Sequence, residues 1–582
     1  MRNIAGLSEV SLDRTGVAMS RLLASVCLAL MTLPMAAQAQ AQARVPEAAP
    51  APAPAAGQPP ALIVTLVVDQ FGADLFNQYR ARFTGGLKRL ADQGRVYANG
   101  YQQHAMTETC PGHATILTGL NPDRAGIPAN DWIDRTTGQE VYCLAAPQNT
   151  LAHGRNTDNG PVGPDQLTAS TVGDWLKAVS PQSRVYAVSG KDRGAITLNG
   201  HQGDGAFWYT VGFGFTTYVE PGQSAEARLE AVTALNARIA ARLVASPPVW
   251  TYSDDRCRAL EADWTIGGAS FRAALPPQRF AIDTSPFLDE MTLEAATALL
   301  DSRQLGRRGV TDMLGVSLSG TDRIGHTFGN QGPEMCDQMH RLDAALGTFL
   351  DRVAQVPGGA LVVLTADHGG NDFPERQSTR GFSEARRGDP ALLGRINAGL
   401  RDEFDLDVDP LSYGGSGLMV VGAENIALPQ PLRARVAAAA VARLRAEPTV
   451  AGAWTIEEAL TAPAPAFDAS PEELSLLERE HVGAVAGRSP DIVLALQPGM
   501  TPGPGRAGLS VAGHGTPWDY DRRVPIIFWS PGGTGQERYL PIRTIDIAPT
   551  LARAMALETP QDLDGRCLDL GLFGAGPCAA RD

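Results

Sequence analysis

ALIVTLVVD, residues 61–69, is an uninterrupted apolar segment that ends in a carboxylate. A continuous apolar run of this length is typical of a buried strand in a parallel sheet. Similar runs follow along the chain, at 185–188, 313–318, 360–365, 418–421, 492–496 and 524–529. Helical periodicity lies between them, at 167–179, 225–245, 286–303, 334–353 and 432–446. This alternation predicts an α/β fold with a mostly parallel central sheet and helices on both of its faces.

The first 60 residues read as export and tether segments. Arg21 precedes an apolar run over 22–35 and small residues over 36–41, an order typical of a secretory signal. We predict a signal peptide with its preceding residues over 1–43 and a Pro/Ala-rich tether over 44–60. The rest, 61–582, is predicted to be one domain with insertions or a cap at about 200–310 and 372–510. The start of translation stays open between Met1 and Met19.

The composition narrows the class of protein. The chain has 582 residues, 44% of them hydrophobic, and a net charge of −14. This describes a globular protein and argues against a nucleic-acid binder, which normally has a basic face. Six of the seven cysteines lie beyond the signal, and an even number in an exported protein permits disulfides. Cys567 and Cys578 form a plausible pair, and the other pairings stay open.

Polar side chains follow three of the predicted strands. Asp69 follows the first strand, Asp322 and His326 follow the strand at 313–318, and Asp367-His368 follow the strand at 360–365. The carboxyl ends of parallel strands meet at one edge of a sheet, where ligands bind. We therefore expect these side chains to gather at that edge.

The residue types at this edge favour a metal site. Asp322 and His326 have a spacing of four, which suits one helical face or one tight turn. His514 lies in the glycine-flanked loop AGHGT, which could bring a third imidazole. Mixed carboxylate and imidazole ligands suit zinc better than calcium or magnesium. Taken one at a time, Asp322 and His326 could be a surface pair, Asp367 a turn residue and His514 a residue that fills a loop. All three explanations together would require several coincidences.

The segment TETCPGHATILTG, residues 107–119, puts a hydroxyl before a Cys-Pro-Gly-His turn. Proline is favoured in the first turn of a helix. Because Pro111 follows Thr109 closely, we expect Thr109 at a helix N-terminus. The free N–H groups there favour an anion, and a nucleophile that attacks phosphate or sulfate would be well placed. An ordinary Thr cap is the alternative.

Together these segments resemble the alkaline phosphatase superfamily, in the branch of Thr-nucleophile bacterial alkaline phosphatases related to nucleotide pyrophosphatase/phosphodiesterases. The motifs are VVDQF, TETCPGHATILTG, GIPANDW, SGKDRGA, GTDRIGHTFG, TADHGG and AGHGT. The resemblance implies two zinc ions per chain and Thr109 as the nucleophile that becomes phosphothreonine. It further implies that Asn130 donates to a phosphoryl oxygen, that Asp322, His326 and His514 hold one zinc, and that Asp69, Thr109, Asp367 and His368 hold the other.

Lys191 and Arg193, in SGKDRGA, decide the expected substrate within this branch. Its monoesterases carry a Lys and an Arg here that contact the phosphoryl oxygens. A monoester is dianionic, and a Lys charge with an Arg fork stabilises its extra charge. A solvated charged loop is the alternative reading. Sulfatases of the superfamily have C-x-P-x-R in place of T-C-P-G-H, and a Thr cannot become formylglycine, so sulfate-ester hydrolysis is disfavoured.

We therefore expect a zinc-dependent alkaline phosphatase that releases inorganic phosphate from small-molecule phosphate monoesters. The alternatives are a phosphodiesterase or nucleotide pyrophosphatase with the same metals and, in another class, a secreted binding protein with structural metals. The expected location is the bacterial periplasm, with no nucleic-acid partner and no transmembrane segment in the mature chain. The oligomeric state stays open, with a monomer compatible with the sequence.

Overall fold

The computed structural model describes residues 58–154, 160–276, 280–501, 505–560, 562–573 and 578. The predicted signal peptide, 1–43, and residues 44–57 of the predicted tether lie outside the described residues. Within the described part of the chain, no helix has both the length and the apolar character that crossing a membrane requires.

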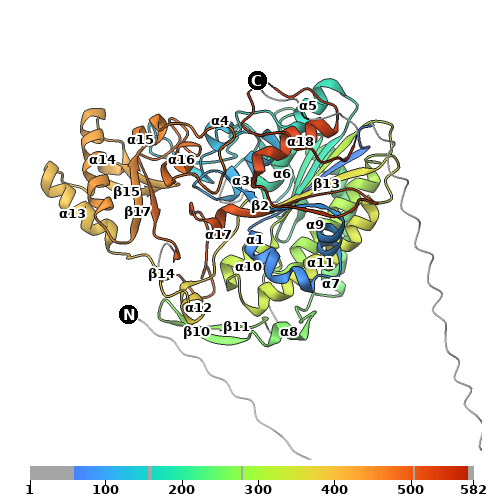
Figure 1. Cartoon of the computed structure of the whole chain (residues 1–582), viewed down its shortest axis with the longest axis horizontal. Helices are drawn as coiled ribbons and strands as arrows, with labels where there is room; N and C mark the ends of the chain where they lie inside the picture. The colour runs from blue at the N-terminus through green and yellow to red at the C-terminus, as the bar shows by residue number, and fades with distance from the viewer. Residues whose placement is uncertain are drawn as a thin grey trace, which may run out of the picture. The chain divides into compact units, whose positions relative to one another are not determined.

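A ten-stranded sheet, counted over the described residues, forms the centre of the fold (Figure 1). β1 (Leu62–Val68) lies between β12 (Asp312–Leu318) and β13 (Ala360–Thr365), parallel to both. The parallel order continues from β12 to β6 (Val185–Ser189) and β7 (Gly205–Thr210). All residues of β1, β12 and β13 are buried, as their continuous apolar sequence predicts.

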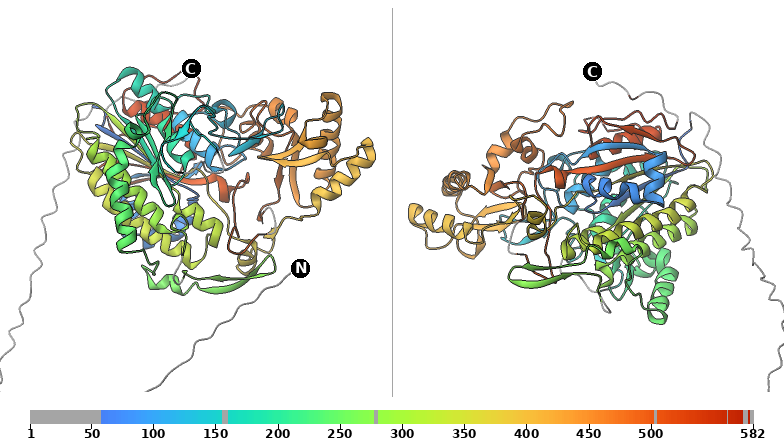
Figure 2. Two further views of the ribbon diagram at one scale, coloured as in Figure 1. Left: turned by 180° about the vertical axis from the view of Figure 1, so that it is seen from behind. Right: turned by 60° about the horizontal axis from the view of Figure 1, so that its bottom comes forward.

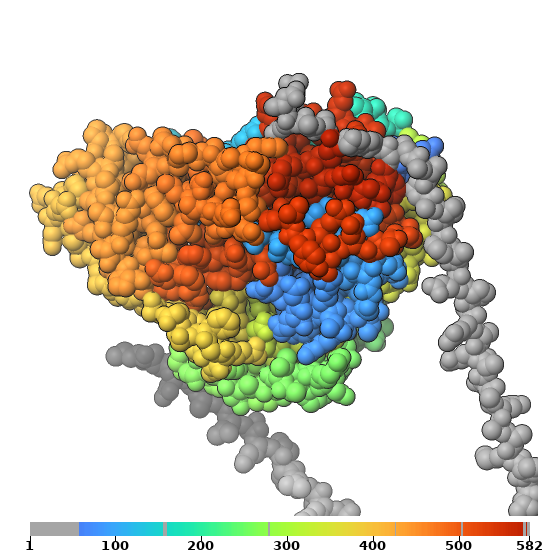
Figure 3. Space-filling model, viewed as in Figure 1, coloured from blue at the N-terminus to red at the C-terminus, as the bar shows by residue number. Residues whose placement is uncertain are grey.

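The other half of this sheet joins distant parts of the chain. β20 (Arg523–Trp529) runs antiparallel between β13 and β2 (Arg95–Tyr101). Figure 3 shows the N-terminal and C-terminal segments side by side on one face. The remaining strands of the sheet are β8 (Gly214–Thr216), β21 (Gln536–Arg538) and β22 (Ile542–Arg543). The predicted mostly parallel sheet is therefore confirmed, with antiparallel pairs at β20 and β8.

Helices cover both faces of the central sheet (Figure 1). One face carries α3 (Thr109–Thr118), α5 (Val172–Val179), α6 (Asp192–Asn199) and α18 (Ile547–Ala554). The other carries α1 (Ala73–Tyr79), α2 (Gly86–Gln93), α7 (Ala225–Ala245), α9 (Pro286–Ser302), α10 (Gly320–Phe328) and α11 (Pro333–Val353). The helix predicted at 167–179 begins only at Val172, because Thr171 and Asp174 form a reciprocal cap there.

Two of the predicted strands belong to a different sheet. β16 (Gly417–Val420) and β18 (Ile492–Leu496) form an antiparallel sheet with β15 (Leu411–Gly414) and β17 (Val450–Thr455). This second sheet, covered by α13 (Leu392–Phe404) and α14 (Gln430–Arg445), has its own apolar core. It lies apart from the central sheet in both views of Figure 2. Both runs lie inside the segment 372–510 that the sequence analysis set apart as an insertion or cap, and they do not extend the parallel sheet. A short apolar run does not by itself specify its pairing partner.

Short elements connect these layers. The two-stranded pairs are β3 (Asp131–Ile133) with β4 (Glu140–Tyr142), β5 (Thr150–Leu151) with β9 (Tyr218–Val219), β10 (Ala262–Ile266) with β11 (Ala269–Ala273), and β14 (Arg386–Arg387) with β19 (Met500–Thr501). The short helices include α4 (Pro122–Ala125), α8 (Asp255–Arg258), α12 (Pro374–Thr379), α15 (Ile456–Thr461), α16 (Leu476–His481) and α17 (Asp519–Arg522).

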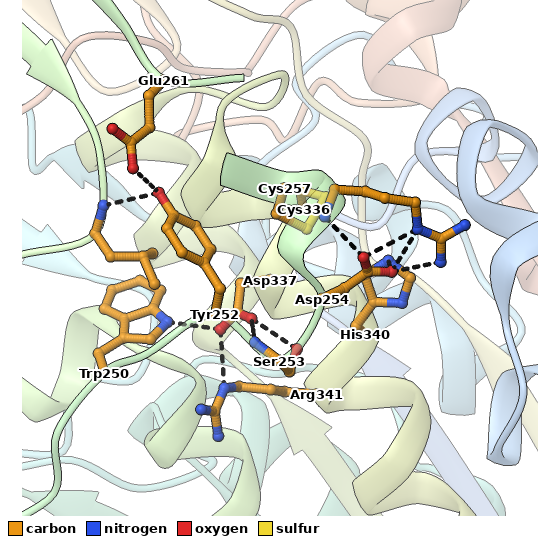
Figure 4. The surroundings of a disulfide bond; sticks show 12 residues. Trp250, Tyr252, Ser253, Asp254, Cys257, Glu261, Cys336, Asp337, His340 and Arg341 are labelled. Carbon is orange, nitrogen blue, oxygen red and sulfur yellow. Dashed lines mark hydrogen bonds and ion pairs between the residues drawn. A yellow bond between two sulfur atoms is a disulfide. The ribbon is translucent and has the colours of Figure 1, made fainter. Parts of the chain in front are cut away.

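Three disulfides link the six cysteines beyond the signal. Cys567 pairs with Cys578, as the sequence suggested, and the other bonds are Cys110–Cys143 and Cys257–Cys336. Figure 4 shows the disulfide Cys257–Cys336, which joins helix α8 to helix α11. The buried carboxylate of Asp337 reinforces this link by accepting hydrogen bonds from Trp250 Nε1 and from the Ser253 backbone and hydroxyl.

Replacing Cys257 and Cys336 together with Ala is expected to lower thermal stability while leaving room-temperature activity. This disulfide joins residues 79 positions apart. Closing a loop of that length in the unfolded chain stabilises the folded state by about 4 kcal/mol. The Cys567–Cys578 disulfide joins residues only 11 positions apart. A matched Cys567→Ala/Cys578→Ala variant should therefore lose less thermal stability. Calorimetry of both variants checks this, and equal melting temperatures for wild type and the Cys257/Cys336 variant would contradict it.

Candidate active site

Four neighbouring strands of the central sheet deliver polar residues to the same edge. Asp69 directly follows β1, and Asp367 and His368 follow β13. Helix α10 begins after β12 and carries Asp322 and His326, one turn apart. Lys191 follows β6 and is the cap residue of α6. The sequence expectation that strand ends collect these side chains matches this arrangement.

Asp322, His326 and His514 meet with their ligand atoms close together. The Nε2 atoms of the two imidazoles lie 3.1 Å apart, and each lies 3.3 Å from Asp322 Oδ1. A tetrahedral zinc site with bonds of about 2.0 Å has ligand-to-ligand edges of about 3.3 Å. These three atoms therefore have the spacing of three corners of such a site.

Asp69, Asp367 and His368 form a second, fully buried group beside the first. His368 Nε2 lies 3.5 Å from Asp69 Oδ1 and 3.5 Å from Asp367 Oδ2. The rings of His368 and His514 stack with their centroids 3.7 Å apart, so the two groups are adjacent. The arrangement can hold two metal ions as neighbours.

The three imidazoles are oriented by backbone carbonyl groups. Nδ1 of His326 donates to Ala512 O at 3.0 Å, that of His368 to Gly369 O at 2.8 Å, and that of His514 to Thr107 O at 2.7 Å. A carbonyl only accepts, so these contacts place a proton on Nδ1 of each ring and turn Nε2 toward the carboxylates. Burial lowers the pKa of His368 well below its usual value, which keeps that ring neutral with a lone pair on Nε2. Burial also lowers the pKa of His514, but the hydrogen bond to Asp322 and the charge of that carboxylate outweigh burial and raise that pKa to about 9.

The charges at this edge require cations. Three buried carboxylates, Asp69, Asp322 and Asp367, face one ammonium group, that of Lys191. Lys191 Nζ lies 2.6 Å from Asp69 Oδ2 and 2.5 Å from Asp322 Oδ2. Burial, and then the charges of Asp322 and Asp367, raise the pKa of Asp69. Bound cations would relieve this excess of negative charge.

Several buried ligand atoms also lack hydrogen bonds. Asp69 Oδ1, Asp322 Oδ1 and His368 Nε2 have no hydrogen-bond partner within the described part of the chain. Among the same residues, Asp69 Oδ2 and Asp367 Oδ2 have only ion-pair contacts, the shortest with Lys191 and His113 respectively. Buried polar atoms are normally satisfied. Since these orphaned atoms are carboxylate oxygens and imidazole nitrogens, the donor set fits zinc.

Thr109 is the first residue of α3, and Glu108 is the cap residue. The alternative that Thr109 merely caps the helix is therefore excluded. Its hydroxyl lies 3.5 Å from Lys191 Nζ. Gly112 lets this helix approach the end of β13 closely, because a Cβ there would lie 2.2 Å from the Asp367 carbonyl oxygen. The backbone packing thus brings the hydroxyl beside the buried carboxylates.

Asn130 and Arg193 lie at the cleft that leads to Thr109. Asn130 Oδ1 accepts the Cys110 N–H at 2.9 Å, and this contact orients the amide so that its NH₂ group is available as a donor. The cleft has a volume of about 270 Å³ and is lined by Glu108, Thr109, Asn130, Arg193, Asp322, His326, Arg387, Thr501, Gly505, Ser510, Val511, Ala512, Gly513 and His514.

Sequence reasoning missed two polar residues that act on this site. Arg387 donates to the carboxylate of Glu375 and to the Val511 carbonyl, and so holds the loop that carries His514. His113, one turn after Thr109 on α3, lies with Nδ1 3.0 Å from Asp367 Oδ2. The motif around Thr109 contains His113, but no pattern in the sequence indicates Arg387.

Comparisons with known proteins agree with this geometry. A family model described as type I phosphodiesterase / nucleotide pyrophosphatase matches residues 63–508. The chain is 39% identical to alkaline phosphatase PhoK of Sphingomonas sp, over 90% of this chain and 94% of PhoK. It is 36% identical to alkaline phosphatase PhoD of Zymomonas mobilis, over 89% and 90% of the two chains.

A solved structure has the same fold. The crystal structure of wild-type alkaline phosphatase PafA is 26% identical in sequence and aligns with a TM-score of 0.75. The alignment covers 88% of this chain and 99% of PafA. The similarity therefore extends over most of both chains.

Proposed function

Since this chain belongs to the type I phosphodiesterase / nucleotide pyrophosphatase family and is a phosphoric ester hydrolase, we propose that it is a zinc-dependent alkaline phosphatase. It cleaves phosphate monoesters through a phosphothreonine at Thr109 and releases inorganic phosphate. The observation that carries this proposal is the ammonium group of Lys191, which lies 3.5 Å from the Thr109 hydroxyl. The names of the relatives support it.

The charge of the substrate explains why this contact matters. A phosphate monoester is dianionic and has three non-bridging oxygens, whereas a diester has one charge and a second ester group. Lys191 beside the nucleophile and Arg193 at the cleft add two cations, and a dianion gains more from them than a monoanion. The NH₂ group of Asn130 supplies a further donor to these oxygens.

Two zinc ions per chain complete the proposed site. Asp322, His326 and His514 would hold one ion, and Asp69, Thr109, Asp367 and His368 the other. When bound, the ions would lower the pKa of the Thr109 hydroxyl and stabilise the charge on the leaving oxygen.

The chain's own residues carry out two displacements. In the first, Thr109 Oγ1 forms a bond to phosphorus as the bond from phosphorus to the ester oxygen breaks, and the alcohol leaves. In the second, water attacks phospho-Thr109, the bond from phosphorus to Oγ1 breaks, and phosphate departs. Asn130, Lys191 and Arg193 hold the non-bridging oxygens through both steps.

A phosphodiesterase or nucleotide pyrophosphatase with the same metals is the second candidate, favoured by the description of the family model. A secreted binding protein with structural metals would have closed metal sites. The open cleft beside Asp322, His326 and His514 speaks against it. We further propose a protein exported to the bacterial periplasm that acts on small phosphate esters.

Removal of metal is expected to abolish hydrolysis of an aryl phosphate monoester, and zinc is expected to restore it better than magnesium. The reason is the mixed imidazole and carboxylate donor set, which magnesium binds poorly. Dialysis against a chelator, metal analysis and re-addition of each ion to the same sample test this. Circular dichroism of the stripped protein controls for unfolding. Full activity at zero metal content would refute the two-metal proposal.

A further inference from the structure

Arg193 is held at the cleft by a tyrosine that lies about fifty residues earlier in the chain. Arg193 Nη1 donates to the Tyr142 hydroxyl at 3.4 Å, and that hydroxyl donates to Asp192 Oδ1 at 2.8 Å. Asp192 Oδ1 also accepts the backbone N–H of Arg193 at 2.8 Å. The hydroxyl therefore lies between a guanidinium and a carboxylate that are neighbours in sequence.

This tyrosine belongs to the same structural unit as Asn130 and Thr109. Tyr142 is the last residue of β4 and pairs with Asp131, the residue after Asn130. The next residue, Cys143, is bonded to Cys110, which follows Thr109. The Cys143 N–H also donates to the Asn130 carbonyl at 2.9 Å. One hairpin and one disulfide thus connect the nucleophile, Asn130 and the hydroxyl that contacts Arg193.

The position of the hydroxyl limits how Arg193 can move. Arg193 Nη1 lies 4.0 Å from Asp192 Oδ1, too far for a hydrogen bond. Without the Tyr142 hydroxyl, the guanidinium would be free to close onto this carboxylate and form a direct ion pair. Such a pair would turn the Arg193 guanidinium away from the cleft and neutralise its charge.

We propose that Tyr142 is a positioning residue that keeps the Arg193 guanidinium directed at the phosphoryl oxygens and away from Asp192. The proposal deepens the proposed monoesterase function and rests on it. Tyr142 contacts no reacting atom and acts only through Arg193. Burial, and then the charge of Asp192, raise the pKa of Tyr142, so the phenol keeps its proton at alkaline pH and remains a donor to Asp192.

The test is Tyr142→Phe, which removes one oxygen and keeps the ring. We expect kcat/KM for an aryl phosphate monoester to fall about tenfold or more, the size expected for a hydrogen bond to a charged group. A matched aryl phosphate diester should lose much less. The inhibition constant of inorganic phosphate should rise in parallel. Tyr209→Phe, a buried tyrosine of the core, is the matched control and should leave all three values unchanged.

A double-mutant comparison separates positioning from a general structural effect. Tyr142→Phe is expected to add little to Arg193→Ala, because the hydroxyl acts only through that guanidinium. Equal losses on both substrates, additive losses in the double variant, or unchanged phosphate inhibition would overturn the proposal. If the wild type hydrolyses the diester faster than the monoester, the proposed monoesterase function itself is refuted. If the wild type prefers the monoester and Tyr142→Phe behaves like wild type, only the role of Tyr142 fails.

Discussion

Thr109→Ala is expected to lower kcat/KM for phosphate monoesters by about four orders of magnitude or more, the scale seen when a catalytic nucleophile is removed. Thr109 is the first residue of α3 and is buried. Alanine is a good helix former and fits that space, so the fold should survive. The side chains of Lys191 and Arg193 and the proposed metal ligands other than Thr109 itself remain, which isolates the effect of losing the hydroxyl.

Two measurements check this result. Steady-state kinetics give the loss in kcat/KM, and acid quench with labelled substrate should trap phosphothreonine in the wild type but not in the variant. Thr109→Ser is the matched control, because it keeps a hydroxyl at the same position and should retain substantial activity. Zinc analysis of each variant excludes loss of metal as the cause. Activity of Thr109→Ala within tenfold of wild type would rule out the covalent route.

The residues at the strand ends could be predicted because their signal is local. The strands β1, β12 and β13 are continuous apolar runs that stop at a polar residue, and a parallel sheet must bring such ends together. Asp322 and His326 lie on one helix at a spacing of four, so their proximity also follows from the sequence.

Other contacts depend on long-range packing that no local pattern records. His514 reaches Asp322 from a loop 192 residues further along the chain, and only its glycine-flanked motif indicated it. The proposed role of Tyr142 depends on the register of β3 with β4 and on the bond between Cys110 and Cys143. For the same reason, the apolar runs of β16 and β18, although inside the predicted insertion at about 372–510, did not reveal which strands they pair with.

Replacing Lys191 and Arg193 with Ala is expected to reduce monoester hydrolysis by about a thousandfold or more, and diester hydrolysis far less. Both cations face the substrate in the proposed complex, and each stabilises the second negative charge that only the monoester carries. Arg193→Lys keeps the charge but loses the planar guanidinium group. Its rate of monoester hydrolysis should lie between those of wild type and Arg193→Ala. Paired kinetics on matched aryl monoesters and diesters measure the difference.

Lys191 requires a control of its own, because it also lies against two metal ligands. Its ammonium group contacts Asp69 and Asp322, so Lys191→Ala could change zinc affinity as well as phosphate binding. Zinc content and competition with a chelator must therefore be measured on each single variant. If zinc is retained and only monoester turnover falls, the two cations determine the substrate class. If both substrates lose equally with zinc in place, the cations do not discriminate, and the phosphodiesterase alternative becomes the better explanation of the site.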